Sequence, residues 1–355
     1  MDKTKVPEMK IIQVCPRYFP DIGGVETHVR EIAERLVKKG HNVEVVCTDP
    51  GGVHPKTDFI NGVSVTRFRS FAPHDAFFIA PKMAPYLKTL DAEILHAHGY
   101  HAFPAMFAMM AARDKRFIFT PHYHGKGHTP LRNMLLTFYN PIGKAVFSRA
   151  NRIICVSEYE RKLITVKFGI QDEKFVVIPN GLNLSEFSGI TGMKNHQRIL
   201  HVGRLEAYKG IQHIIEALPE LPDYTLTLVG KGPYESELHQ LATEKDVSDR
   251  ITWKKDLSRE ELLQEYALAG LFISLSSFEA YGITVAEALV SGLQVIVNRN
   301  GALGEFVDGI TCVGIDPSPE NLVKAIQSMK PGQGYRKKVL GWDEVVKRIV
   351  EIYFE

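Results

Sequence analysis

The feature that most constrains the fold is an alternation of short apolar runs with amphipathic segments, which occurs twice along the 355 residues. In its first occurrence, residues 10–15 form a run in which only Lys10 and Gln13 are polar, and the segment 25–37 then carries apolar side chains at helical spacing before Gly40. A second run follows at residues 43–47, with Glu44 as its only polar residue. Strands that alternate with helices in this way predict a parallel sheet covered by helices on both faces.

The alternation continues along the chain and divides it into two parts. Further runs of strand length lie at residues 63–68, 93–96, 117–120, 153–157, 176–179, 199–203, 226–230, 251–253, 271–275 and 295–297. The polar stretch 183–197, which contains Gly189 and Gly192, is interpreted as a linker. We therefore predict an α/β protein with two Rossmann-like, doubly wound parallel-sheet domains, over residues 1–182 and 183–341.

The final segment, residues 342–355, is predicted to form an amphipathic helix, because its apolar residues share one helical face. We expect it to return to the first domain. Packing on the second domain fits the pattern equally well.

Composition bounds the class of protein. With 45% hydrophobic residues, the chain is long enough for two domains with separate cores. Its four cysteines lie far apart without C-x-x-C spacing, which is typical of reduced core residues in a cytoplasmic protein. The first ten residues lack an apolar signal core, and the longest apolar stretch, residues 103–112, is far shorter than the roughly 20 residues of a membrane span. We expect a cytoplasmic protein.

The net charge of +2 conceals an asymmetry between the halves. Residues 1–180 carry 25 Lys and Arg against 17 Asp and Glu, a net charge of +8, which leaves −6 for residues 181–355. A basic first half could attract an anionic acceptor, or anionic lipid headgroups at the inner face of a membrane, or the acidic half of the same chain. Because the charges are scattered, nucleic acid is not expected as a partner.

Two carboxylates mark a candidate ligand-binding turn. Glu279 and Glu287 follow the apolar run 271–275 and flank a turn at Gly282 that precedes a helix-like stretch. A strand that turns into a helix here aims backbone N–H groups and a positive helix end at an anion. Carboxylates accept hydrogen bonds from sugar hydroxyls, so the pair suits recognition of a polyol. The alternative is a capping residue and a solvated helix residue.

Cations and glycines follow two neighbouring strands. Arg204 and Lys209 lie after the run 199–203, near the start of a helix, where they could neutralise a diphosphate. Gly230 begins a turn at the next strand end and could line a base pocket. Surface charge and simple turn formation are the alternatives.

The first domain contributes two more candidates. Gly23 and Gly24 follow the first strand and would let the backbone approach a phosphate closely, although they form neither G-x-G-x-x-G nor a P-loop. His122 follows another strand, where it could hydrogen-bond a substrate or move a proton. Metal binding through His96, His98, His122 and His124 is a weaker alternative, because no carboxylate or cysteine pattern accompanies them.

Taken together, these motifs resemble the family 4 retaining glycosyltransferases. The resemblance rests on the Gly23-Gly24 loop, His122, Ile178-Pro-Asn-Gly181, Gly203-Arg204 with Lys209-Gly210, and the Glu279 to Glu287 pair, which together cover nearly the whole chain. It implies the two-domain GT-B fold with the active site in the interdomain cleft. The chain departs from the family at Ala302 and Cys312, where glycines are common.

The resemblance also implies roles for residues. Arg204 and Lys209 would bind the donor diphosphate, Glu287 the nucleotide ribose, and Glu279 the donor sugar. His122 would position that sugar. The implied catalytic residues are His122, Arg204, Lys209 and Glu279, and the implied donor-binding residues are Gly23, Gly24, Arg204, Lys209, Gly230, Glu279, Ala280, Tyr281, Gly282, Ile283 and Glu287.

The implied reaction transfers a sugar from a nucleotide-diphosphate sugar to an acceptor hydroxyl, with the anomeric configuration retained. The acceptor would be a sugar, a polysaccharide or a lipid-linked molecule. No cofactor and no metal are expected, because cationic side chains and helix N-termini would neutralise the diphosphate in place of a metal ion. A sugar-nucleotide epimerase and a non-catalytic nucleotide-sugar-binding protein are the alternatives.

Apolar residues on the acceptor side leave two interpretations open. Residues 70–145 include Phe77, Phe78, Met106, Met109 and Met110. These side chains could admit a lipid-linked acceptor, although core and helix packing is the more common use of such residues.

Overall fold

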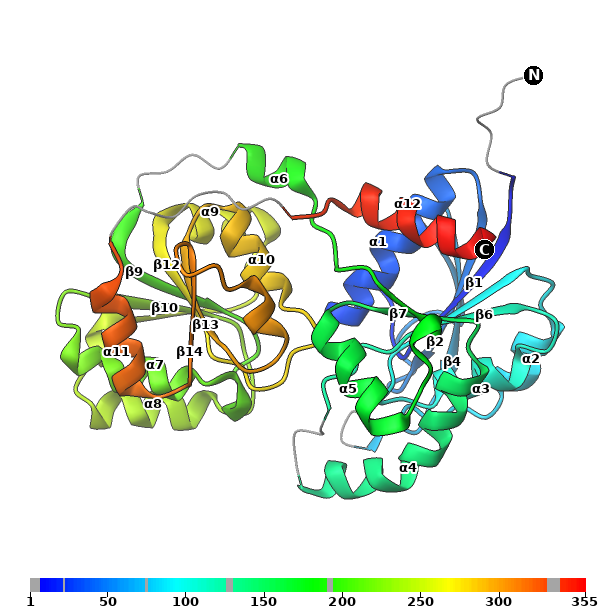
Figure 1. Ribbon diagram of the computed structural model, residues 1–355, viewed down its shortest axis with the longest axis horizontal. Coiled ribbons are helices and arrows are strands. Elements are labelled where there is room, and N and C mark those ends of the chain that lie inside the picture. Colours follow the sequence, from blue (N-terminus) through cyan, green and yellow to red (C-terminus); the bar gives the residue numbers. More distant parts are fainter. Residues whose placement is uncertain (1–6, 22, 74–75, 126–129, 190–193, 331–338) are drawn as a thin grey trace. The chain divides into compact units, whose positions relative to one another are not determined.

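The computed structural model describes residues 7–21, 23–73, 76–125, 130–189, 194–330 and 339–355 (Figure 1). The chain divides into two compact units. The first comprises Met1–Asn180 together with Trp342–Glu355, and the second comprises Gly181–Gly341. Each unit has its own sheet and its own helices, as the twofold alternation in the sequence predicts.

The sheet of the first unit has eight strands. They are β1 (Lys10–Val14), β2 (Asn42–Asp49), β3 (Thr57–Ile60), β4 (Val63–Arg69), β5 (Ile94–His98), β6 (Arg116–Thr120), β7 (Arg152–Cys155) and β8 (Phe175–Val177). Their order in the sheet is β3-β4-β2-β1-β5-β6-β7-β8. All neighbours run parallel except β3, which pairs antiparallel with β4.

Helices cover both faces of this sheet (Figure 1). They are α1 (Gly24–Lys38), α2 (Met83–Thr89), α3 (Pro104–Ala111), α4 (Pro130–Arg149), α5 (Glu158–Phe168) and α12 (Trp342–Phe354). Helices α2, α3 and α4 contribute to one apolar core with strand residues such as Leu95 and Phe117. On the other face, α12 lies beside α1. Buried Val345 and Ile349 lie on the apolar stripe of α12.

The sheet of the second unit has six parallel strands. They are β9 (Asn195–Val202), β10 (Thr225–Val229), β11 (Ile251–Lys254), β12 (Ala269–Ser274), β13 (Gln294–Asn298) and β14 (Cys312–Ile315), in the order β11-β10-β9-β12-β13-β14. The helices are α6 (Leu184–Ser188), α7 (Ile211–Ala217), α8 (Glu235–Glu244), α9 (Arg259–Leu268), α10 (Ile283–Val290) and α11 (Pro319–Ser328).

Successive residues of these strands enter two different cores. Ile199 and Ile273 pack with residues of α7, α8 and α11, whereas the adjacent Leu200 and Phe272 pack with residues of α9 and α10. Alternate side chains of a strand point to opposite faces, so a sheet covered on both faces favours apolar residues at most positions. This explains why the strands appear as continuous apolar runs.

The segment interpreted as a linker is partly structured. Within residues 183–197, α6 forms over Leu184–Ser188 and β9 already begins at Asn195, while residues 190–193 lie outside the described part of the chain. Phe187 on α6 is buried in one of the cores of the second unit. The linker interpretation was therefore wrong for α6, because one buried aromatic anchors an otherwise polar stretch.

Candidate functional site

The candidate donor residues of the second unit follow the carboxyl ends of adjacent strands. Arg204 and Lys209 follow β9, Gly230 follows β10, and Glu279 follows β12, which is the neighbour of β9 on its other side. Because all six strands run parallel, these segments meet at one edge of the sheet. The sequence motifs, which are up to 75 residues apart between Arg204 and Glu279, are therefore brought together by topology.

Lys209 and Glu279 form an ion pair at this edge. The Nζ atom of Lys209 donates to Oε1 of Glu279 at 2.6 Å. The two side chains retain only 16% and 23% of their exposure. Burial by itself lowers the pKa of Lys209, but the adjacent Glu279 carboxylate outweighs it, and the pKa is raised. The pair thus places an ammonium group and a carboxylate side by side.

Backbone contacts hold the two segments together. The N–H of Ser277 donates to the carbonyl of Tyr208 at 2.9 Å, and the rings of Tyr208 and Phe278 lie 5.8 Å apart. Gly210 adopts φ +73°, and a Cβ there would lie 2.8 Å from the Leu275 carbonyl oxygen. The close approach of these segments therefore requires glycine at position 210.

Arg204 differs from Lys209 in its surroundings. Its side chain is 67% exposed and pairs with Glu206 at 2.7 Å. An exposed guanidinium on a flexible stem is free to reorient toward a ligand, and its pairing with Glu206 contributes little stability. The structure therefore brings Lys209 and Glu279 into contact but leaves Arg204 at the surface.

Glycine at position 230 permits close packing of two loops. Gly230 adopts φ +150°, and a Cβ there would overlap the carbonyl oxygen of Gly203. The Gly203 N–H donates to the Val229 carbonyl at 3.0 Å, next to this contact. Glycine is needed here for the packing of the β9 and β10 loops, whatever else Gly230 does.

Glu287 is not a solvated helix residue. It lies on α10 and is 6% exposed. Arg259 donates to its Oε1 at 2.6 Å, and the Tyr266 hydroxyl donates to its Oε2 at 2.9 Å. Arg259 also donates to Glu186 at 2.8 Å. The alternative of a solvated carboxylate is therefore wrong, and Glu287 is oriented by Arg259 and Tyr266 of α9.

The remaining donor candidates form the turn into α10. Gly282 adopts φ +110° immediately before the helix, and a Cβ there would overlap the Leu303 side chain. Ala280, Tyr281 and Ile283 are partly buried, and the Tyr281 ring packs against Phe306 at 5.2 Å. Each lies in the loop between Glu279 and Glu287 or at its end, as the sequence indicates.

His201 was missed by sequence reasoning. It lies on β9, is 1% exposed, and its Nδ1 lies 2.8 Å from the Ile273 carbonyl oxygen. Burial lowers its pKa to about 4, and the charges of Lys209 and Glu279 also act on it. Its Nε2 has no hydrogen-bond partner among the described residues. A polar residue inside an apolar strand run was the signal that could have found it.

In the first unit, Gly23 and Gly24 form the start of α1. Gly23 is the N-cap residue in an extended conformation, and a Cβ there would overlap the Glu26 carboxylate. A Cβ at Gly24 would meet no described atom within 4 Å. The Glu26 side chain therefore lies over Gly23, and the helix start is open at Gly24.

His122 sits on a strained turn after β6. Its φ is +49°, a conformation that non-glycine residues rarely adopt. Glu160, buried on α5, accepts a short hydrogen bond from the N–H of Tyr123 and another from the N–H of Val156 at 2.7 Å. Strained residues that their surroundings hold in place concentrate at functional sites. The contact with Tyr123 gives no local sequence signal, because the two residues are 37 positions apart, whereas Val156 precedes Glu160 by only four residues.

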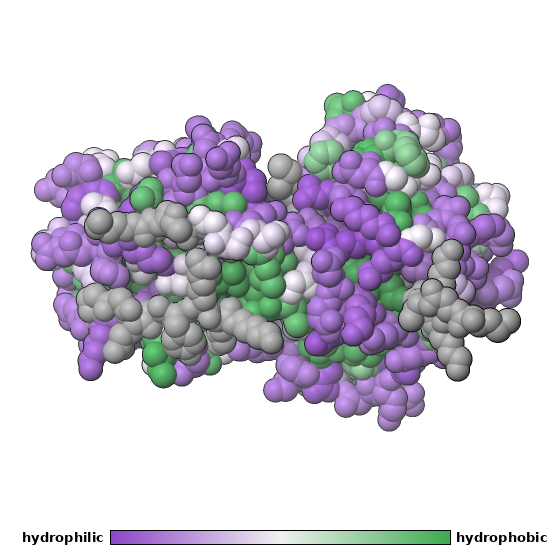
Figure 2. Space-filling model, turned by 90° about the horizontal axis from the view of Figure 1, so that it is seen from above, coloured by the Kyte–Doolittle hydropathy of each residue, from purple (hydrophilic) through white to green (hydrophobic). Residues whose placement is uncertain are grey.

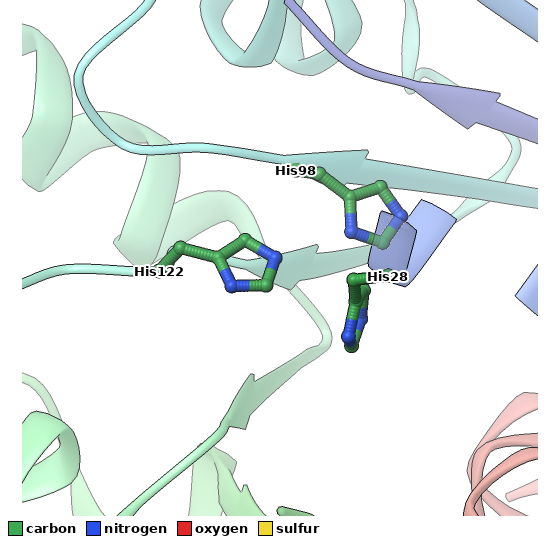
Figure 3. Close-up of side chains that lie close together, drawn as sticks. All are labelled: His28, His98 and His122. Atoms are coloured by element: carbon green, nitrogen blue, oxygen red, sulfur yellow. The ribbon is translucent and has the colours of Figure 1, made fainter. Parts of the chain in front are cut away.

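The structure separates the histidines of the metal alternative. His96 has both ring nitrogens in hydrogen bonds, to the Tyr353 hydroxyl at 2.7 Å and to Thr120 Oγ1 at 2.8 Å. The rings of His98 and His122 instead lie close to His28 of α1 (Figure 3). His28 was missed because it is a single histidine on a helix face.

Some of the apolar residues predicted on the acceptor side are buried by packing, and others are exposed. Phe77 and Phe78 are each 9% exposed, whereas Met110 on α3 and Met134 and Phe138 on α4 are 48%, 52% and 75% exposed. The face of the molecule shown in Figure 2 is predominantly hydrophilic, with smaller apolar areas between. Among the described residues, no helix has the length and apolar content needed to cross a bilayer.

Two family models match the chain in succession. The model described as Glycosyltransferase Family 4 matches residues 22–186, and the model described as Glycosyl transferases group 1 matches residues 186–339. The two matches meet within α6, close to the division between the units.

Similar proteins and structures span the whole chain. A phosphatidylinositol N-acetylglucosaminyltransferase subunit from Arabidopsis thaliana is 24% identical, over 98% of this chain and 82% of that protein. Sucrose-phosphate synthase from Thermosynechococcus elongatus superposes with a TM-score of 0.80 at 18% identity, covering 98% of both chains. The Anabaena protein HepE, solved with UDP and glucose, gives 0.76 at 19% identity, covering 98% of this chain and all of that one. These structures confirm the predicted GT-B fold class of two parallel-sheet domains.

Proposed function

Because the chain belongs to the family 4 and group 1 glycosyltransferases, we propose that it moves a sugar from a nucleoside-diphosphate sugar to an acceptor hydroxyl with retention of anomeric configuration. Membership in the family sets aside the epimerase and the non-catalytic binding protein as alternatives. The observation that carries the donor proposal is the Lys209–Glu279 pair at the carboxyl edge of the second sheet.

The pair offers complementary groups for the two halves of a donor. An ammonium neutralises charge on a diphosphate, which leaves more readily when the developing negative charge is stabilised. A carboxylate beside it accepts hydrogen bonds from sugar hydroxyls. Lys209 would hold the diphosphate and Glu279 the sugar, while exposed Arg204 would turn from Glu206 toward the phosphates.

The nucleoside is assigned to the buried carboxylate of Glu287. Each of its oxygens already accepts one hydrogen bond, from Arg259 or from Tyr266. A carboxylate oxygen can accept more than one, so a ribose hydroxyl could still bind. Arg259 and Tyr266 would then hold the Glu287 carboxylate in a fixed orientation before the ribose binds. The turn from Ala280 to Ile283 would supply N–H groups.

The transfer step needs no protein nucleophile in this proposal. The acceptor hydroxyl attacks the anomeric carbon as the bond to the diphosphate breaks, and its proton passes to the departing phosphate oxygen on the same face. His122 would position the transferred sugar by hydrogen bonding. Burial and neighbouring histidines hold the pKa of His122 well below the ordinary value, so its ring is neutral at pH 7.

The acceptor is assigned to the first unit, whose sequence is basic. The Arabidopsis relative is named for transfer to phosphatidylinositol, and residues 1–180 of this chain carry a net charge of +8. An anionic or lipid-linked acceptor suits both observations, and the enzyme would meet it at the cytoplasmic face of a membrane. A glycan or polysaccharide acceptor is the more general form of the proposal. Exposed Met110, Met134 and Phe138 are available for contact with an apolar chain.

The first experiment is a calorimetric titration with UDP, GDP, ADP, CDP and dTDP in the presence of EDTA. We expect one diphosphate to bind selectively, with weaker binding in Arg204→Ala and Lys209→Met. Lys245→Met is the matched control, because Lys245 is an exposed residue at the end of α8. Equal binding by all variants, or binding that requires a metal, would overturn the donor proposal. NMR of the anomeric proton in the product then tests retention.

A further inference from the structure

Three histidines of the first unit converge from three separate elements. His28 lies on α1, His98 ends β5 and His122 follows β6, and Figure 3 shows the three rings gathered together. One ring nitrogen from each residue lies within 4.8 Å of the other two. The ring centroids of His28 and His122 are 4.7 Å apart, and those of His28 and His98 are 5.4 Å apart.

Each of these rings has one buried nitrogen that lacks a hydrogen-bond partner among the described residues. The atoms are Nε2 of His28, Nδ1 of His98 and Nε2 of His122. Buried polar atoms in folded proteins are nearly always paired, so three unpaired atoms in one cluster require an explanation. A ligand that accepts three lone pairs at once would provide it.

The opposite nitrogens of two rings are already held. Nδ1 of His28 lies 2.7 Å from Oδ1 of Asn180, and Nε2 of His98 lies 2.6 Å from Oε1 of Gln13. Gln13 is itself oriented by donating to the Tyr353 hydroxyl at 3.0 Å. Since the amide oxygens accept, the bonded ring nitrogens carry the protons and the unpartnered nitrogens keep their lone pairs. Metal-binding histidines are held by such outer hydrogen bonds.

We propose that His28, His98 and His122 form a binding site for one first-row transition-metal cation, with Zn²⁺ as the ion that fits best. Three imidazoles with a fourth, open position are an established zinc coordination, and imidazole ligands do not suit Mg²⁺ or Ca²⁺. Zn–N distances of about 2.0–2.1 Å in a tetrahedron separate the nitrogens by roughly 3.4 Å. Binding would therefore draw the rings together from the present 4.8 Å limit.

The proposed ion takes no part in donor binding, but its site shares His122 with the proposed sugar site. No step of the proposed reaction passes through the ion, and the donor residues Lys209 and Glu279 lie in the second unit. A bound cation would, however, occupy the free nitrogen of His122. Metal binding and donor binding can each fail without the other, because nucleoside diphosphates are titrated in EDTA and the metals are titrated without nucleotide.

The test is titration of the full chain, stripped with EDTA and dialysed, with Zn²⁺ alone and with Co²⁺ alone. We expect one tightly bound metal ion per chain, and visible cobalt d–d bands without the charge-transfer band of a cobalt–thiolate bond. His28→Gln and His98→Gln should each lose this tightly bound ion. His96→Gln is the matched control, because His96 is buried 4.2 Å from the His98 ring but has both nitrogens paired. It should keep the bound ion.

Circular dichroism establishes that each variant is folded before its titration is interpreted. Undiminished metal binding in folded His28→Gln and His98→Gln would overturn the proposal, as would wild-type protein that binds no metal ion. If the variants do not fold, X-ray absorption of the zinc-loaded wild type decides the matter. Three imidazole ligands would support the site, whereas a sulfur ligand or fewer than three imidazoles would overturn it.

Discussion

Exchange of Lys209 for methionine removes one charge from the proposed donor site while nearly preserving side-chain length. In the structure, Nζ of Lys209 lies 2.6 Å from Oε1 of Glu279. The exposed fractions of the two side chains, 16% and 23%, place the pair between a surface and a buried ion pair. Breaking it leaves Glu279 partly desolvated without this cation, which destabilises the folded state.

The expected magnitudes follow from that intermediate burial. Surface pairs contribute about 0–1 kcal/mol, and breaking a buried pair costs about 3–5 kcal/mol. We therefore expect Lys209→Met to lower the free energy of unfolding by about 1–3 kcal/mol. Loss of charge-assisted hydrogen bonds to a diphosphate costs about 1.5–3 kcal/mol, so the dissociation constant of the nucleoside diphosphate should rise roughly 10- to 150-fold.

Glu279→Gln should change the affinity for a nucleoside diphosphate in the opposite direction from Lys209→Met, or leave it equal. Without the carboxylate, the Lys209 ammonium is available to phosphate, so the affinity for a nucleoside diphosphate should stay equal or increase. Affinity gained from the sugar of the intact donor should decrease, because the amide replaces one carboxylate oxygen with a donor. The double variant should recover part of the stability lost in Lys209→Met, since no unpaired charge remains.

The assay combines urea unfolding with calorimetry of the wild type, both single variants and the double variant. Each protein is titrated with the selected nucleoside diphosphate and with the corresponding sugar nucleotide. Equal diphosphate affinity in wild type and Lys209→Met, at unchanged stability, would refute the assignment of Lys209. Parallel loss of diphosphate affinity in Glu279→Gln would refute the division of roles between the two residues.

Three further perturbations test the supporting structure. Gly230→Ala should destabilise the second unit by about 2–4 kcal/mol in urea unfolding, because its Cβ would overlap the Gly203 carbonyl oxygen; wild-type stability would contradict the close packing. Glu160→Gln should lower kcat through displacement of His122 and leave diphosphate affinity unchanged, and equal kcat would remove Glu160 from the positioning of that turn. His201 has a pKa of about 4 in the folded state against an ordinary value of 6.5, so the unfolded state binds more protons between these values and stability falls as pH drops. Between pH 7.5 and pH 5 this residue should account for about 2 kcal/mol of the loss, and His201→Asn should show a correspondingly smaller change in unfolding free energy.

The fold class was accessible from the sequence because parallel sheets leave a local signal. Strands that are buried on both faces must be apolar at consecutive positions, and the intervening helices carry apolar residues at helical spacing. Strand β3 escaped prediction because its residues alternate between partly buried and exposed at the sheet edge. Helix α6 escaped because a five-residue helix provides too few turns for a periodic pattern.

The candidate site could be predicted where its residues share a short segment. Glu279, Gly282 and Glu287 belong to one turn and helix, so their spacing along the chain already relates them in space. That Arg204 and Lys209 lie at the same sheet edge also follows, because parallel strands end together.

The two repeats of strand and helix, and the strand ends at which the motifs lie, could thus be predicted from local patterns along the chain. The contact of Arg259 with Glu287, the approach of His28 to His98 and His122, and the packing of α12 beside α1 were visible only in the folded units. Periodicity records which face of an element is buried, and it contains no information about which distant side chain that face meets. Those partners depend on how helices and strands pack, and packing is set by the whole unit at once.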